Sequence, residues 1–195
     1  MTRKQLIKVV VLGDASVGKT SLIHQFVYST FHENYKATIG ADFMTKEVFI
    51  SDTLLTLQLW DTAGMEKFAS LGVAFYRGAD VCVLCFDLTN AVTLEHVLKW
   101  KDEFNVHANP SQDFTFICVG NKCDAKERVI SQEQASLFCK QHHMQYMESS
   151  AKENVNVKEV FELVAEKGML NVKKDQDQQQ HVDFTEITNQ NKGCC

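Results

Sequence analysis

This chain of 195 residues lacks long apolar runs, an excess of positive charge and a hydrophobic N-terminal segment. No stretch approaches the roughly 18 apolar residues of a membrane-spanning helix, which argues against a transmembrane protein. The net charge is −5, and nucleic-acid-binding proteins are usually basic, so we expect no nucleic-acid partner. Residues 1–5 lead into a strand pattern without a separate hydrophobic segment and cleavage site, so we expect no secretory signal.

Disulfides and cysteine-bound metals are not expected either, although the chain has seven cysteines. Cys82, Cys85 and Cys118 lie inside apolar runs, where cysteine behaves as a small hydrophobic residue. Cys82 and Cys85 spell C-x-x-C, but residues three apart in a strand point to opposite faces and cannot share a metal or a disulfide. Free thiols in a core are typical of a reducing cytosol.

A glycine-rich stretch is the strongest motif that is present. Residues 13–20 read GDASVGKT, which fits the pattern of a phosphate-binding loop. The apolar run Val9–Leu12 before it indicates a buried strand, and residues 21–27 after it have the apolar spacing of a helix. A strand, a glycine loop and a helix in this order are the context that the motif requires.

This loop predicts a site for a polyphosphate. Its successive N–H groups would point inward at the phosphates, and the helix adds its N-terminal N–H groups and dipole. Lys19 supplies a charge to the terminal phosphates, and the Thr20 hydroxyl suits Mg²⁺, which prefers oxygen ligands. The candidate phosphate-binding residues are Asp14, Ala15, Ser16, Val17, Gly18, Lys19, Thr20 and Ser21.

The remaining pattern predicts an α/β fold. Residues 41–50 and 54–60 indicate two strands joined by a short turn, hence an antiparallel pair at one edge. The continuous apolar runs 81–86 and 114–119 are typical of parallel strands buried on both faces. Helical spacing lies between the strands, so we expect a mostly parallel six-stranded sheet with helices on both faces.

Local signals predict three helices and some of their ends. Apolar residues from Leu94 to Phe104 follow the spacing of the first of them. Ser131 and Gln134 have the form of a capping box for a second helix. Asn156 is a candidate cap of the last helix, and Gly168 is a candidate stop.

Further polar motifs follow predicted strands, where ligands bind in such sheets. Asp61 follows the strand that ends at Trp60, and its carboxylate can orient a water on Mg²⁺. The N–H of Gly64 can approach the terminal phosphate. Between the first helix and second strand, Thr38 is a candidate second hydroxyl on Mg²⁺, with an ordinary loop threonine as the alternative.

A guanine site is predicted after the fifth and sixth strands. Asp124 can accept from N1–H and the exocyclic amine of guanine, whereas adenine would leave the carboxylate unpaired. Asn121 can bond the base and tie loops together, and the stem of Lys122 can lie along the ring. Phe31 could pack on the guanine, and the Ala151 N–H could reach the base oxygen. Ser150, Lys152 and Tyr35 complete the candidate nucleotide site.

These residues resemble the Rab family of small GTPases, within the Ras superfamily. The resemblance covers residues 6–168 and the terminal cysteines, and residues 35–43 (YKATIGADF) and 70–80 (SLGVAFYRGAD) are most similar to its late-endosomal members. It implies a P-loop GTPase fold, GTP and GDP as ligands, Mg²⁺, and control of vesicle traffic to late endosomes and lysosomes. Exchange factors, activating proteins, escort or dissociation-inhibitor proteins and effectors are the implied partners. An aromatic triad that partners read would be Phe43, Trp60 and Phe75.

Met65 departs from the family pattern. The family has Gln directly after Asp-Thr-Ala-Gly, where it orients the attacking water. A thioether has no N–H donor, so we expect hydrolysis to be slower than in Gln-bearing relatives. The other candidate catalytic residues are Gly64 and Lys19. A GTP-binding scaffold with negligible hydrolysis is the alternative, and Asp124 argues against a third reading as an ATPase or kinase.

The C-terminal segment differs from the expected GTP-binding domain at 1–170. Residues 171–195 are polar and low in complexity, so we expect a disordered tail. Its Cys194-Cys195 ending does not fit the C-a-a-X signal, and resemblance implies two geranylgeranyl groups. The tail has three Lys against three Asp and one Glu, so a polybasic patch is absent and both lipids are needed. The resemblance implies attachment to the cytosolic face of endosomal or lysosomal membranes. Nothing in the sequence indicates homo-oligomerisation, so we expect a monomer.

Overall fold

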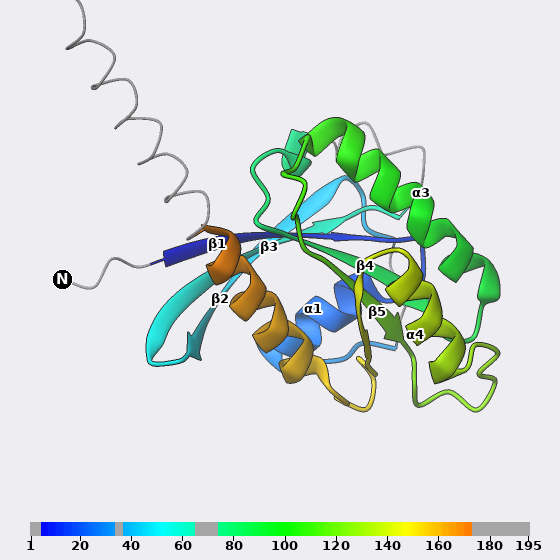
Figure 1. Cartoon of the computed structure of the whole chain (residues 1–195). Coiled ribbons are helices and arrows are strands. Elements are labelled where there is room, and N and C mark those ends of the chain that lie inside the picture. The colour runs from blue at the N-terminus through cyan, green and yellow to red at the C-terminus, as the bar shows by residue number, and fades with distance from the viewer. Residues whose placement is uncertain (1–4, 34–36, 65–73, 173–195) are drawn as a thin grey trace, which may run out of the picture.

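The computed structural model describes residues 5–33, 37–64 and 74–172. Its strands form one six-stranded sheet in the order β2-β3-β1-β4-β5-β6 (Figure 1). Strand β2 is antiparallel to β3, and all other neighbours are parallel, which confirms the predicted sheet with its antiparallel edge. The strands are β1 (Gln5–Leu12), β2 (Ala41–Ile50), β3 (Thr53–Thr62), β4 (Val81–Asp87), β5 (Phe116–Asn121) and β6 (Gln145–Glu148).

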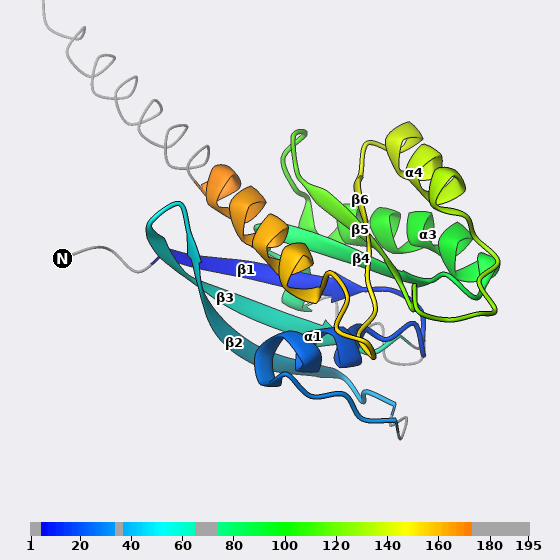
Figure 2. The same ribbon diagram turned by 90° about the horizontal axis from the view of Figure 1, so that it is seen from below.

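Helices cover both faces of the sheet, as expected. Helix α1 (Lys19–Tyr28) and a helix over residues 157–172 lie on one face, and α3 (Ala91–Ala108) and α4 (Gln132–Gln141) lie on the other (Figure 2). Alternate residues of β1 supply the two cores: Val9 packs in the first and Val10 in the second. This alternation follows from the period-2 geometry of a strand, and it explains why β1 is apolar without interruption.

The helix ends only partly follow the sequence signals. Ser131 and Gln134 form the predicted capping box of α4. Asn156 precedes the last helix, but its side-chain amide donates to the Glu148 carbonyl at 3.0 Å. The prediction that Gly168 ends this helix is wrong, because the helix continues through residue 172. A Cβ at Gly168 would lie 2.2 Å from Cγ2 of Ile7, so the glycine is needed for close packing on β1.

The structure describes five of the seven cysteines: Cys82, Cys85, Cys118, Cys123 and Cys139. The described cysteines are all free thiols, and burial raises the pKa of Cys85 to about 12. No group of three His, Cys, Asp or Glu side chains within residues 5–33, 37–64 and 74–172 could hold a metal. Within the same ranges, no helix is long and apolar enough to span a bilayer.

Candidate functional site

A cavity of about 810 Å³ lies at the carboxyl ends of the strands. The parallel strands all end at this edge of the sheet, so loops that are distant in sequence meet there. The predicted site residues that line the cavity are Ala15, Ser16, Gly18, Lys19, Thr20, Ser21, Phe31, Thr38, Gly64, Asn121, Lys122, Asp124, Ala151 and Lys152.

Four residues predicted for the nucleotide and metal site are described but do not line the cavity: Asp14, Val17, Asp61 and Ser150. Val17 is buried, and its carbonyl accepts from Asn121. The buried Ser150 hydroxyl accepts from the Glu153 N–H at 2.9 Å. The Asp14 side chain is bound by α3. Tyr35, Met65, Cys194 and Cys195 lie outside the described residues.

Sequence reasoning missed several residues of the cavity wall. His24 lies one helical turn after Thr20 on α1, and this i, i+4 spacing is the signal that could have found it. His32 and Glu33 directly follow Phe31. The missed lining residues are His24, His32, Glu33, Ala37 and Ala125.

Lys19 lies at the centre of the phosphate loop. Its side chain is buried, and Nζ donates to the carbonyls of Gly13 at 2.7 Å and Asp14 at 2.8 Å. Burial lowers the Lys19 pKa, and the nearby Asp61 carboxylate opposes this shift. The loop carbonyls therefore hold the ammonium group where the loop N–H groups would receive a phosphate.

Three oxygen-bearing side chains meet beside Lys19. Oγ1 of Thr20 lies 2.8 Å from Oγ1 of Thr38 and donates to Oδ2 of Asp61 at 2.5 Å. Asp61 is fully buried, and within the described part of the chain its Oδ1 has no hydrogen-bond partner. Burial raises the Asp61 pKa, and the Thr20 hydrogen bond and the Lys19 charge oppose it.

This donor set fits a Mg²⁺ ion. Two hydroxyls and a carboxylate are hard oxygen ligands, and Mg²⁺ usually keeps some of its waters in such sites. A buried carboxylate oxygen without a partner costs free energy, and a water on the metal would satisfy Oδ1 of Asp61. Thr20, Thr38 and Asp61 therefore remain the candidate residues for holding Mg²⁺.

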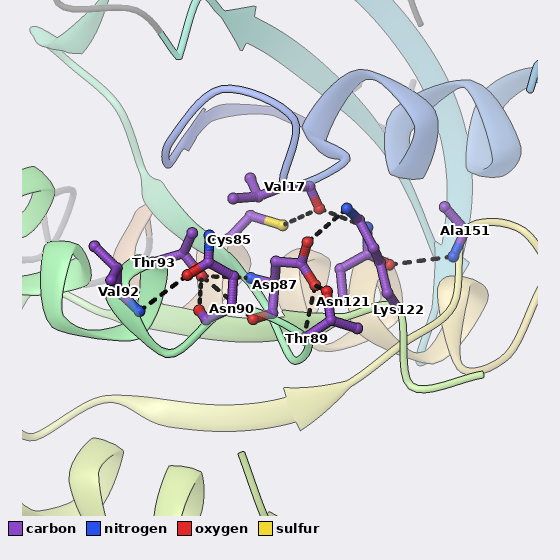
Figure 3. A network of polar contacts seen from close by, with 10 residues as sticks. All are labelled: Val17, Cys85, Asp87, Thr89, Asn90, Val92, Thr93, Asn121, Lys122 and Ala151. Carbon is purple, nitrogen blue, oxygen red and sulfur yellow. Dashed lines mark hydrogen bonds and ion pairs between the residues drawn. The ribbon is translucent and has the colours of Figure 1, made fainter. Parts of the chain in front are cut away.

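Asn121 links three loops at the other end of the cavity (Figure 3). Its Nδ2 donates to the Val17 carbonyl at 2.9 Å, and its Oδ1 accepts from the Ala151 N–H at 3.2 Å. The loop-tying role predicted for Asn121 is therefore present in the geometry. The Ala151 N–H, expected to reach a base, here donates to Asn121 instead.

Asp87 is a further residue of this network that sequence reasoning missed. It ends β4, and its Oδ2 accepts from Nζ of Lys122 at 2.5 Å (Figure 3). Its Oδ1 accepts from the hydroxyl and the N–H of Thr89. A polar residue at the carboxyl end of a buried strand was the available signal. The pair holds the Lys122 stem beside the cavity, while Asp124 presents an exposed carboxylate.

An ion pair joins the segment after β5 to the end of β6. The Nη1 and Nη2 atoms of Arg128 donate to the two carboxylate oxygens of Glu148 at 2.8 and 2.5 Å. The Tyr146 hydroxyl also donates to Glu148 at 2.8 Å. The Cys123 N–H donates to the Ser149 carbonyl at 3.0 Å. The loop that carries Lys122 and Asp124 is therefore hydrogen-bonded to the residue that follows β6.

The three predicted partner-reading aromatics form one cluster on the sheet. The Phe43 and Trp60 ring centroids are 4.8 Å apart, and those of Trp60 and Phe75 are 4.4 Å apart with stacked rings. Phe43 pairs with Trp60 in the β2–β3 register. Phe43 is 44% exposed, and an exposed aromatic of this kind is typical of interaction surfaces.

The sequence matches a family model and several characterised relatives over most of its length. Residues 8–170 match the family model described as "Ras family". A "Ypt/Rab-type GTPase ypt7" of Schizosaccharomyces pombe is 51% identical over 89% of this chain and 87% of its own length. "Ras-related protein Rab-7a" of Dictyostelium discoideum is 51% identical, and "Ras-related protein Rab7" of Pisum sativum is 50% identical, each over 84% of this chain and 82% of the relative. The chain therefore belongs to the Ras family, and within it to the Rab-type small GTPases.

Proposed function

We propose that the cavity holds GTP or GDP with Mg²⁺ and that the bound nucleotide sets the conformation of the surrounding loops. The observation that carries this proposal is the meeting of Thr20, Thr38 and Asp61, which come from three separate segments. When bound, the metal ion neutralises charge on the phosphates. Thr38 and Gly64 lie on the loops that would respond to the terminal phosphate, and release of these contacts after hydrolysis would reset them.

Specificity for guanine is assigned to Asp124. Its carboxylate can accept two hydrogen bonds from guanine, and a site built for these donors rejects a base that lacks them. Asn121 and the Asp87–Lys122 pair hold the loop that carries it. Phe31 lines the same cavity and is assigned to packing on the base.

Hydrolysis of GTP to GDP and phosphate is the reaction of this Rab-type GTPase. Lys19 is assigned to the terminal phosphates, and the Gly64 N–H to the transferred phosphoryl group. Met65 stands where relatives by resemblance carry the water-orienting Gln, so unassisted hydrolysis is expected to be slow. Met65 also supports a second candidate function, a GTP-binding scaffold that nucleotide exchange switches.

Vesicle traffic toward late endosomes is the proposed cellular role. Its support is the Rab-type relatives at about half identity, several with Rab7 or Ypt7 in their names. The cluster of Phe43, Trp60 and Phe75 is the proposed face for effectors, and geranylgeranyl groups on Cys194 and Cys195 are the proposed anchor. Exchange factors, activating proteins and dissociation inhibitors are the regulators assigned by family.

Nucleotide analysis of the purified full-length chain tests the proposal. The purified protein should contain GDP or GTP. Bound labelled GDP should exchange for GTP added in excess but not for ATP added in excess. Asp124→Asn exchanges an acceptor for a donor and should lower GTP affinity by at least about 100-fold. Lys126→Ala, an exposed change in the same loop, is the control. Equal competition by ATP would refute the guanine assignment.

A membrane experiment tests the cellular role. The full chain is expressed in cells, and the share on late-endosomal membranes is compared with the Thr38→Ala variant. Thr38→Ala should reduce the share of protein on these membranes, because it removes the hydroxyl through which the loop would respond to Mg²⁺ and the terminal phosphate. Thr115→Ala, at the opposite end of the sheet before β5, is the matched control. A wild-type chain found on other membranes would overturn the assignment to late endosomes.

A further inference from the structure

The Asp14 side chain points away from the cavity that its own loop forms. Its Oδ2 lies 2.7 Å from Nδ1 of His96, and its Oδ1 accepts from Nε1 of Trp100 at 2.8 Å. Both partners lie one turn apart on α3 and reach Asp14 across more than 80 residues of sequence. Each carboxylate oxygen thus has its own partner, and Trp100 is only 9% exposed.

The Asp14 backbone takes part in the phosphate site while its side chain is held from behind. The Asp14 carbonyl accepts from Nζ of Lys19 at 2.8 Å. Rotation of the peptide between Asp14 and Ala15 would move this carbonyl and the Ala15 N–H together, because the peptide group is planar. Fixing the Asp14 side chain therefore restricts both groups.

The same peptide contacts the start of the segment after β3. A Cβ placed on Gly64 would lie 2.4 Å from the Ala15 nitrogen and 2.5 Å from the Asp14 carbonyl oxygen. Only a residue without a side chain fits against this peptide. A shift of the Asp14–Ala15 peptide would thus also disturb Gly64, which is assigned to the terminal phosphate.

We propose that Asp14 is a positioning residue and that His96 and Trp100 of α3 hold it as a clamp on the phosphate loop. This inference rests on the proposed nucleotide site and adds α3 to the groups that control it. The clamp fixes the Asp14–Ala15 peptide against Lys19 on one side and Gly64 on the other. Retention of GDP and the rate of hydrolysis both depend on that placement, since small displacements of positioning groups are costly.

Release of a fluorescent GDP analogue from the full-length chain in excess Mg²⁺ tests the clamp. His96→Leu keeps the branching of the side chain but removes the nitrogen, and should speed release about tenfold, as expected for loss of one hydrogen bond to a charged group. His96→Asn restores an N–H donor at the position of Nδ1 and should return release to within about twofold of wild type. Trp100→Phe removes Nε1 and should also speed release about tenfold.

The matched controls are His107→Leu and His107→Asn. His107 lies on the same helix, with its ring 6.5 Å from that of Tyr76, and neither change should alter release. Recovery by His96→Asn is the decisive measurement, because a merely structural loss in α3 would not respond to one restored donor. Equal release from His96→Leu and His96→Asn, or no change in either, overturns the inference.

A spectroscopic readout follows the clamp directly. The chain has two tryptophans, so Trp60→Phe leaves Trp100 as the only indole. In that background, Asp14→Ala should change the emission of Trp100, because it removes the acceptor of Nε1. Trp100 emission that is unchanged by Asp14→Ala overturns the inference. A wild-type chain that retains no labelled GDP overturns the proposed function itself, whereas unchanged release in the variants overturns the clamp alone.

Discussion

Asn121 and Val17 are 104 residues apart in sequence, and Nδ2 of Asn121 donates to the Val17 carbonyl at 2.9 Å. This hydrogen bond joins the loop assigned to the base with the loop assigned to the phosphates. Oδ1 of the same side chain accepts from the Ala151 N–H. One buried amide therefore sets the distance between the two ends of the nucleotide site.

Replacing Asn121 with Ala should weaken guanine-nucleotide binding by about 10- to 100-fold, since buried hydrogen bonds to two loops are lost together. The measurement is the dissociation rate of fluorescent GDP. Asn105→Ala on α3 is the control, because Ala suits a helix interior. Tight binding in Asn121→Ala would show that the loops keep their spacing without this bond.

Met65→Gln should raise single-turnover GTP hydrolysis by at least about tenfold, equivalent to about 1.4 kcal/mol of barrier. The amide adds a donor and an acceptor for the attacking water, which the thioether lacks. Met65→Leu is the matched control and should leave the rate unchanged. Equal rates in wild type and Met65→Gln would discard the hypothesis that Met65 slows the reaction.

Glu148→Gln should destabilise the fold by about 2 kcal/mol at neutral pH, through loss of charge-assisted hydrogen bonds from Arg128. Burial alone would raise the Glu148 pKa, but the hydrogen bonds from Arg128 and Tyr146 bring it below its ordinary value of 4.5. The stability that this carboxylate contributes is therefore complete above pH 4.5 and is lost as the pH falls below it.

Urea unfolding of the GDP-bound protein at a series of pH values measures this effect. The difference between wild type and Glu148→Gln should be constant from pH 7 to 5 and shrink below pH 4.5. Glu166→Gln, an exposed change on the last helix, should match wild type throughout. A difference that grows toward acid pH would contradict the assigned direction of the pKa.

Cys195→Ser should leave the protein largely in the supernatant of a membrane-pelleting assay after expression in eukaryotic cells. One lipid chain binds a bilayer only marginally, and the tail has no net positive charge to supplement it. The double variant Cys194→Ser/Cys195→Ser defines the background, and Cys194→Ser should match Cys195→Ser. Undiminished pelleting of either single variant would argue against the need for two lipids.

The sequence by itself determined the order of strands and helices and the chemistry of each loop. Uninterrupted apolar runs such as Val81–Phe86 identified strands buried on both faces, and the residues after the strands predicted which loops bind the phosphates and the base. These signals are local, since periodicity and turn composition act within a few residues. The wrong prediction that the last helix ends at Gly168 shows the limit of such local signals. The glycine is required by close packing against Ile7, which is distant in sequence.

Only the tertiary structure decided which distant groups act together. No local pattern connects Asp14 with His96 and Trp100, Asp87 with Lys122, or Arg128 with Glu148. Each of these contacts joins segments that are distant in sequence and that only the packed fold brings together. A side-chain hydrogen bond depends on distances of about 3 Å, and those follow from packing of the whole sheet. Residue types thus predicted the ligand, whereas the packed fold determined how its binding loops are held.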